Sequence, residues 1–228
     1  MKVLVACEES QVVCTAFREK GHEAYSCDIQ ECSGGHPEWH IQDDVLNLLN
    51  GDCIFTTSDS VDRRITGEWD LIIAHPPCTY LTNGGAVRMF RKETRDYEPY
   101  GTFQMVNVDR LKQGMLAKDF FMKFYNANSK RVVIENPVPM SIYMLPKPTQ
   151  VIQPFMFGEP FSKKTCLWIK GLSPLKPTNV LTEYQPFING GGGRMHRPNY
   201  KGKKFAVGSC IRSKTFEGVA KAMAEQWG

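Results

Sequence analysis

The chain has 228 residues, of which 42% are hydrophobic and 23% are charged, the ordinary balance of a globular protein. The 28 lysines and arginines exceed the 24 aspartates and glutamates by four, and this excess permits an anionic partner without requiring one. No apolar run approaches the roughly 18 residues of a membrane span. The run at residues 3–6 is also shorter than the roughly 7–15 apolar residues of a signal peptide.

The eight cysteines are irregularly spaced, and several lie in apolar, strand-like segments. This pattern indicates reduced thiols rather than a disulfide framework. We therefore expect a single domain over residues 1–228, located in the cytoplasm and without a membrane segment.

The first part of the chain alternates short apolar runs with helical patterns. Residues 3–7 predict a strand, and residues 12–20 predict a helix that ends at a glycine. A second strand is expected over residues 23–29, and residues 40–49 predict a strand edge followed by one or two helical turns. Residues 69–75 predict a strand that is covered on both faces.

The second part continues the alternation. A helix is expected over residues 108–125 and a buried strand over residues 131–137, where a proline halts it. Residues 163–172 are strand-like, and residues 215–227 predict a terminal helix. Between them, residues 189–204 form a glycine-rich basic loop, which either follows a phosphate backbone or is simply a solvated loop.

Strands and helices that alternate in this way predict an α/β fold with a doubly wound, mostly parallel, Rossmann-like sheet and a reduced C-terminal appendage. Ligands bind such sheets at the carboxyl ends of the strands. We expect Asp28, Cys78 and Glu135 to lie on this same edge, because each closes or follows a predicted strand.

A thiol and a carboxylate on the same edge of the sheet suggest a catalytic site. The dipole near a helix N-terminus can favour a Cys78 thiolate, and two prolines stiffen the chain before it. Burial at the end of an apolar strand is expected to raise the pKa of Glu135 and suit it to donate a proton. A nucleophile beside a proton donor fits attack on an electron-poor ring.

The segments that carry these two residues read DLIIAHPPCTYL and VVIENP. In order and spacing they resemble the proline-proline-cysteine and glutamate-asparagine-valine motifs of the cytosine-5 DNA methyltransferase family. Residues 3–29 lie where that family has its first cofactor motif, and IQDDV resembles its glycine-aspartate-isoleucine motif. FGEPFSKKTCLWI and RSKTFEGVAKAMA resemble its paired-arginine motif and its final cofactor motif. The CEESQ and HPPCTYL segments are similar to a short phage-encoded branch that lacks a full target-recognition domain.

The resemblance implies a methyltransferase fold and a role for each matching residue. Cys78 would add to carbon 6 of cytosine while Glu135 engages ring nitrogen 3, and carbon 5 would take the methyl group of S-adenosyl-L-methionine. Asn136 would brace the pocket, and Lys163 and Lys164 stand at the positions of the paired arginines. No metal is implied. The matching cofactor positions are Cys7, Glu8, Glu9, Ser10, Asp28, Ile29, Asp44, Val45, His75, Pro76, Ser213 and Thr215.

The chain departs from the family in three places. The alternating glycines of the first motif are replaced by residues 7–11, where Glu8 and Glu9 could pair with the cofactor's ammonium group. Lysine lacks the planar fork of arginine and would hold the cytosine carbonyl only as a point charge. Only residues 174–208 remain for target recognition. The expected substrate is therefore DNA with low or short sequence specificity, unless a partner protein or a homodimer supplies it.

Three alternatives remain open from the sequence. A chain without a recognition domain could methylate a free deoxycytidine nucleotide, or it could be a catalytically silent protein that binds nucleic acid or the cofactor. The third alternative is a small zinc knuckle. Its ligands would be Cys27, Cys32, His36 and His40.

Overall fold

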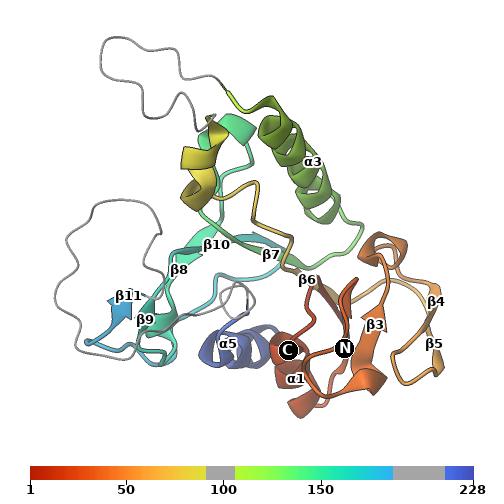
Figure 1. Ribbon diagram of the computed structural model, residues 1–228. Helices are drawn as coiled ribbons and strands as arrows, with labels where there is room; N and C mark the ends of the chain where they lie inside the picture. The colour runs from red at the N-terminus through yellow and green to blue at the C-terminus, as the bar shows by residue number, and fades with distance from the viewer. Residues whose placement is uncertain (91–105, 187–213) are drawn as a thin grey trace, which may run out of the picture.

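The computed structural model describes residues 1–90, 106–186 and 214–228, which build a mixed α/β fold around a seven-stranded sheet (Figure 1). The order of the strands in the sheet is β3-β2-β1-β6-β7-β10-β8. Their bounds are β1 Lys2–Ala6, β2 Glu23–Asp28, β3 His40–Gln42, β6 Leu71–Ala74, β7 Val132–Pro137, β8 Gln150–Ile152 and β10 Thr165–Lys170.

The sheet is mostly parallel, as the sequence predicts. The strands from β3 to β7 are parallel to their neighbours, whereas β10 runs antiparallel to both β7 and β8. The order reverses between β1 and β6, because the chain first builds outward to β2 and β3 and then returns to the other side of β1. This reversal is the switch point beside which doubly wound sheets bind their ligands.

Helices cover both faces of the sheet. Helices α1 (Val12–Glu19) and α5 (Glu217–Trp227) lie side by side on one face, and α3 (Val108–Tyr125) lies on the other (Figure 1). Successive strand residues point to opposite faces. In β1, accordingly, Leu4 belongs to the hydrophobic cluster under α3, whereas Val3 belongs to the cluster under α1 and α5.

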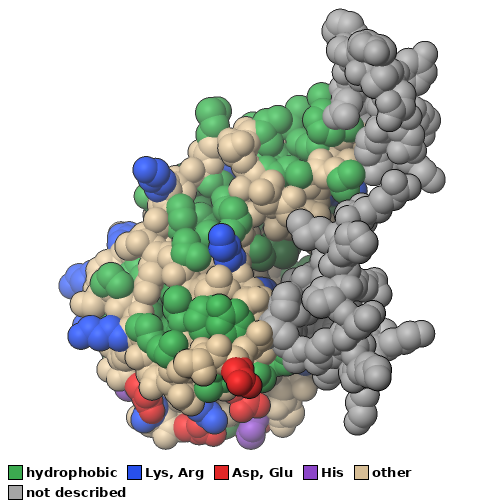
Figure 2. All heavy atoms as spheres, turned by 90° about the vertical axis from the view of Figure 1, so that its left-hand side faces the viewer, with side chains coloured by type: hydrophobic (Ala, Val, Ile, Leu, Met, Phe, Trp, Pro, Cys, Tyr) green, Lys and Arg blue, Asp and Glu red, His purple; other side chains and the backbone are tan. Residues whose placement is uncertain are grey.

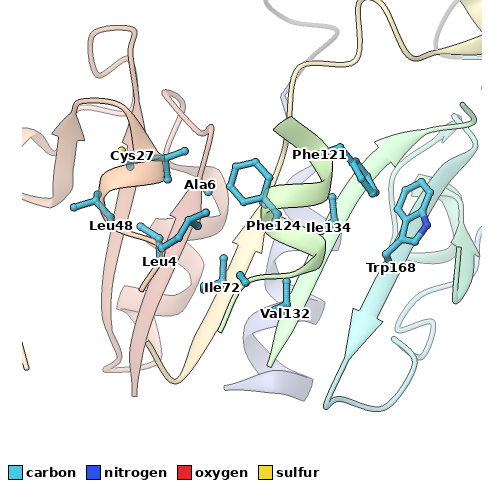
Figure 3. Packing of buried hydrophobic residues seen from close by; sticks show 14 of the residues in the cluster. Leu4, Ala6, Cys27, Leu48, Ile72, Phe121, Phe124, Val132, Ile134 and Trp168 are labelled. Atoms are coloured by element: carbon cyan, nitrogen blue, oxygen red, sulfur yellow. The ribbon is translucent and has the colours of Figure 1, made fainter. Parts of the chain in front are cut away.

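The cluster under α3 forms the larger core (Figure 3). Phe121 and Phe124 of α3 are fully buried over the strands, and the ring of Phe121 meets the ring of Trp168 edge-on at 4.9 Å between centroids. Burying one such side chain contributes about 1.5–3 kcal/mol. The strand side chains beneath them include Leu4, Ala6, Ile72, Val132 and Ile134.

Several small elements have no counterpart in the sequence prediction. The hairpin of β4 (Cys53–Thr56) and β5 (Asp62–Ile65) buries only Phe55 and Ile65 among its eight residues, so its apolar pattern is weak. Two further strands pair with each other, β9 (Phe161–Ser162) and β11 (Gln185–Pro186). The short 3-10 helices without a counterpart are η1 Pro37–Trp39, η3 Asn83–Met89, η4 Ser141–Tyr143 and η5 Pro154–Met156, whereas η2 Val45–Asn47 forms the helical turn predicted within residues 40–49.

The predicted basic loop at residues 189–204 lies outside the described residues. Figure 2 shows the face that carries β8 and β9, where hydrophobic side chains gather in several patches. The lysines and arginines visible there are scattered rather than joined in one basic surface. In the described part of the chain, no helix has the length and apolar character needed to cross a membrane.

Candidate functional site

The candidate site lies at the switch point, where β1 and β6 end next to each other. Ala6 is paired with Ala74 in the last register position of the two strands. The main-chain N–H of His75 donates to the carbonyl oxygen of Ala6 at 2.9 Å, and that of Cys7 donates to Cys27 at 2.7 Å. The loops that follow the two strands therefore start from fixed positions on one edge of the sheet.

The main chain around Cys78 is held from two other elements. Asn136 of β7 donates its side-chain N–H to the carbonyl oxygen of Pro76 at 2.9 Å, and Arg110 of α3 donates to the carbonyl oxygen of Thr79 at 2.8 Å. The carbonyl oxygen of Cys78 accepts the N–H of Thr82 at 2.9 Å, which closes a turn. Cys78 is thus placed by contacts on both sides of it.

The thiol of Cys78 is not activated in the way that the sequence suggests. Burial raises the pKa of Cys78, the carboxylate of Glu135 raises it further, and Lys163 offsets only part of this. The expectation that the strand end favours the thiolate is therefore wrong for the protein alone. The reason is that desolvation and a neighbouring negative charge outweigh any local dipole.

Glu135 also differs from its expected protonation. Its side chain is 11% exposed, and Oε2 lies 3.2 Å from Nδ1 of His75, whose side chain is 9% exposed. Burial alone would raise the pKa of Glu135, but the hydrogen bond from His75 and the charges of Lys163 and His75 hold it below its usual value. The prediction of a raised pKa is therefore wrong, because the sequence did not reveal the partner histidine.

The two candidate lysines lie in different surroundings. Lys163 acts electrostatically on both Glu135 and Cys78, and its Nζ lies 5.8 Å from the centre of the Phe216 ring. Lys164 is exposed, and the titratable group on which its charge acts is Cys166. The structure brings only Lys163 to the Cys78–Glu135 pair.

A pocket of about 270 Å³, including space open to solvent, opens beside Glu135 and Lys163. It joins the end of β7 to the segment before α5, so that residues far apart in the chain line one space. Thr215, a predicted cofactor residue, lies in its wall, whereas Ser213 lies outside the described residues. The lining residues are Glu135, Ile152, Pro154, Lys163, Thr165, Thr215, Phe216 and Val219.

Glu8 acts as the cap of helix α1. It is buried, and its two carboxylate oxygens accept the N–H groups of Val13 at 2.7 Å and Cys14 at 3.1 Å. Burial raises the pKa of Glu8, and His75 together with these two N–H groups offsets part of the rise. The sequence placed Glu8 near a ligand's ammonium group, but its oxygens are already used to hold the helix.

Glu9 faces the C-terminal segment. Its carboxylate accepts the hydroxyl of Ser33, and its carbonyl oxygen accepts the N–H of Ser33 at 2.9 Å. The same hydroxyl oxygen accepts a hydrogen bond from Nζ of Lys214 at 3.2 Å. These contacts bring the residues before α5 to the loop after β1, with half-buried Ser10 next along the loop.

Gln11, which the sequence analysis missed, organises the neighbouring loop. It is fully buried at φ 58°, and its side-chain amide donates to the carbonyl oxygen of His36 at 2.9 Å and accepts the N–H of His36 at 3.0 Å. It also lies 3.3 Å from the hydroxyl of Ser26. The one signal in the sequence for this role of Gln11 is that a polar residue stands directly before a predicted helix.

The acidic cofactor candidates surround Cys7. Burial raises the pKa of Cys7, and Asp28 and Asp44 add to this rise, so both carboxylates lie close to the end of β1. Asp28 accepts the N–H of Gln30 at 2.9 Å, and exposed Asp44 caps η2. The residues that follow the two aspartates differ in exposure: Ile29, after Asp28, is 77% exposed, whereas Val45, after Asp44, is part of the core.

Each proposed zinc ligand forms hydrogen bonds with different partners. His40 bonds Ser26 and Gln30, Cys32 donates to Gln11, and His36 pairs with Glu38. Cys27 donates to the carbonyl oxygen of Asp43. Among the described residues, no group of three or more histidines, cysteines, aspartates or glutamates is placed to hold a metal ion.

No protein-family model matches the chain, and no curated protein matches it. Among solved structures it is similar to the crystal structure of the Spodoptera frugiperda DNMT2 E260A/E261A/K263A mutant, with 15% identity and a TM-score of 0.33. The match covers 82% of this chain and 55% of that chain. A similarity at this distance identifies no activity for the chain.

Proposed function

We propose that the chain is an S-adenosyl-L-methionine-dependent methyltransferase that methylates carbon 5 of cytosine in DNA, with low or short sequence specificity, through a covalent adduct with Cys78. The observation that carries this proposal is the cluster of Cys78, Glu135 and Lys163 at the carboxyl ends of β6 and β7. A thiol next to a carboxylate and a cation suits addition to an electron-poor ring.

The charged groups at the end of β1 fit the cofactor. Asp28 and Asp44 place negative charge at the end of β1, which suits a cationic sulfonium. Their carboxylate oxygens can also accept hydrogen bonds from ribose hydroxyls. In this proposal Asp28 holds the ribose, Asp44 lies near the adenine, and Thr215 lines the wall beside α5. When bound, the cofactor supplies the methyl group. The chain's residues orient it and exclude water.

The proposed mechanism assigns one task to each residue of the cluster. The raised pKa of Cys78 keeps it a thiol in the free protein, so its proton passes to solvent as the sulfur adds to carbon 6 of the ring, and Cys78 regains a proton from solvent after it departs. Glu135 engages ring nitrogen 3, and Lys163 faces the ring carbonyl as a point charge. Carbon 5 then becomes nucleophilic, and loss of its proton after methylation expels Cys78.

A cytosine within duplex DNA must leave the base stack to reach Cys78. A free cytosine nucleotide is the second candidate substrate, because residues 174–208 are too few for a full target-recognition domain.

The test is methyl transfer from radiolabelled S-adenosyl-L-methionine to duplex DNA, single-stranded DNA or deoxycytidine nucleotides. We expect label in DNA with the wild-type chain and none with Cys78→Ala, which still binds the cofactor. Incorporation into nucleotides alone would select the second candidate. Equal activity of Cys78→Ala would eliminate the proposed nucleophile, and no transfer to any substrate would favour a silent binding protein.

Trapping provides an independent readout of the adduct. In a substrate with fluorine at carbon 5, the proton whose loss releases Cys78 is absent, so the sulfur–carbon bond persists after methyl transfer. The wild-type chain is expected to form a complex that resists denaturation, and mass spectrometry is expected to locate the link at Cys78. A link at another cysteine would contradict the assignment.

A further inference from the structure

We propose that His75 is a positioning residue that shares one proton with Glu135 and supplies the proton that Glu135 delivers to nitrogen 3 of cytosine. This inference rests on the proposed function and adds to it a residue that acts through Glu135. In the resemblance His75 is only a cofactor position, whereas in the structure its ring faces the proposed catalytic carboxylate.

The first argument is geometric. Nδ1 of His75 lies 3.2 Å from Oε2 of Glu135, and the two side chains are 9% and 11% exposed. The main chain of His75 is itself fixed, because its N–H donates to Ala6 at 2.9 Å. A pair that is this desolvated interacts far more strongly than a surface ion pair, since water screens it little.

The second argument is an atom without a partner. Nε2 of His75 is buried and has no hydrogen bond among the described residues, and the same is true of Oδ1 of Asn136. Asn136 follows Glu135 in β7 and bonds the residue after His75 through its amide nitrogen. Buried polar groups are nearly always satisfied, so the unpaired Nε2 on the ring that faces Glu135 indicates a place for water or substrate.

The charges around the pair come from separate elements. Glu8, in the loop after β1, interacts electrostatically with His75, and Lys163, before β10, interacts with Glu135. Cys78 lies on the same loop as His75, and the charge of Glu135 raises its pKa. The imidazole thus lies near the carboxylates of both Glu8 and Glu135.

The chemistry requires such a proton. When the sulfur of Cys78 adds to carbon 6, an electron pair moves onto nitrogen 3 of the ring. Ionised Glu135 has no proton to give, so in the proposal His75 is an imidazolium that passes its Nδ1 proton to Oε2 and keeps its Nε2 proton, and the carboxyl proton then passes to nitrogen 3. When the carbon 5 proton leaves to solvent and Cys78 departs, the nitrogen 3 proton returns through Glu135 to His75. The pair therefore ends each turnover as it began.

The first test needs no substrate. The carboxyl group of Glu135 is titrated by carbon-13 NMR in the wild-type chain and in His75→Phe and His75→Asn variants, with Glu135→Gln used to assign the signal. We expect a pKa below the usual value in the wild-type chain and a higher pKa in His75→Phe, because the hydrogen bond and charge of His75 are lost. His75→Asn, which keeps an N–H donor near Nδ1, is expected to fall between them. An unchanged titration in His75→Phe would overturn the proposal, whatever the activity.

The second test separates donation of a hydrogen bond from supply of a proton. His75→Asn is expected to lose about tenfold or more in kcat with little change in KM, and to flatten one limb of the pH–rate profile. His22→Asn, at the far end of β2, is the matched control and is expected to keep the wild-type profile. A wild-type pH profile in His75→Asn would overturn the proposal while leaving the proposed function intact. A wild-type chain with no methyl transfer would overturn the proposed function, and proton delivery to cytosine with it, even if the NMR coupling were present.

Discussion

Asn136 ties the strand that carries Glu135 to the loop that carries Cys78, through a hydrogen bond of 2.9 Å from its amide nitrogen to the carbonyl oxygen of Pro76. Asn136 is 1% exposed, so no solvent replaces this contact when it is lost. This buried amide is therefore one of the contacts that fix the position of the thiol relative to the carboxylate, and its loss has a measurable consequence.

We expect Asn136→Ala to lower the free energy of unfolding by about 1–3 kcal/mol, because the buried carbonyl of Pro76 is left without a donor. Denaturant titration measures this change, and Asn50→Ala, at an exposed position, serves as the control. Equal stabilities of the two variants would show that the Asn136 contact contributes little.

Glu135→Gln is expected to make Cys78 more reactive. Burial is the main cause of the raised pKa of Cys78, and the Glu135 carboxylate raises it further. Removal of that negative charge is therefore expected to lower the pKa of Cys78 and to increase the thiolate fraction. Alkylation of Cys78 by iodoacetamide at pH 8, followed by peptide mass spectrometry, is expected to accelerate by about 3–10-fold. Glu19→Gln, at an exposed position, is the control, and slower alkylation in Glu135→Gln would contradict the assigned charge effect.

Lys163→Ala and Lys164→Ala form a matched pair of neighbouring substitutions. Lys163 lowers the pKa of Cys78 and of Glu135, so its loss is expected to slow alkylation of Cys78 by about threefold or more. Lys164 is exposed, and its removal is expected to leave that rate unchanged. Equal effects of the two substitutions would mean that overall charge, rather than the position of Lys163, controls the thiol.

Glu8→Ala is expected to destabilise helix α1 by about 1–2 kcal/mol, the usual cost of losing an N-terminal cap. Thermal or denaturant unfolding measures the change, and the exposed Glu19→Ala in the same helix is the control. If Glu8 instead served only a ligand, its removal would leave the stability of the free protein unchanged.

The sequence predicted the elements that have strong apolar patterns. Residues 108–125 match the bounds of α3, and β1, β7 and β10 lie within one or two residues of the predicted runs. The strand β8 was missed because it has only three residues and lies at the edge of the sheet. Short elements of this kind form through their neighbours rather than through their own pattern.

Within the site, the sequence could place Cys78 and Glu135 on one edge but could not give the sign of their pKa shifts. These signs depend on which groups the fold brings within a few ångströms, and His75 and Lys163 lie 60 and 28 positions from Glu135 in the chain. The role of Glu8 was missed for the same reason, because its oxygens turn forward onto α1.

The packing of α1 against α5 has a consequence for how the chain folds. Both helices share one hydrophobic cluster, yet they are separated by about 200 positions in the sequence. Closure of such a distant contact is slow, because the loop entropy is lost before the contact forms. During synthesis the side of α1 that packs against α5 remains uncovered until α5 has emerged. The nascent chain therefore has to keep this surface from aggregating for most of its translation.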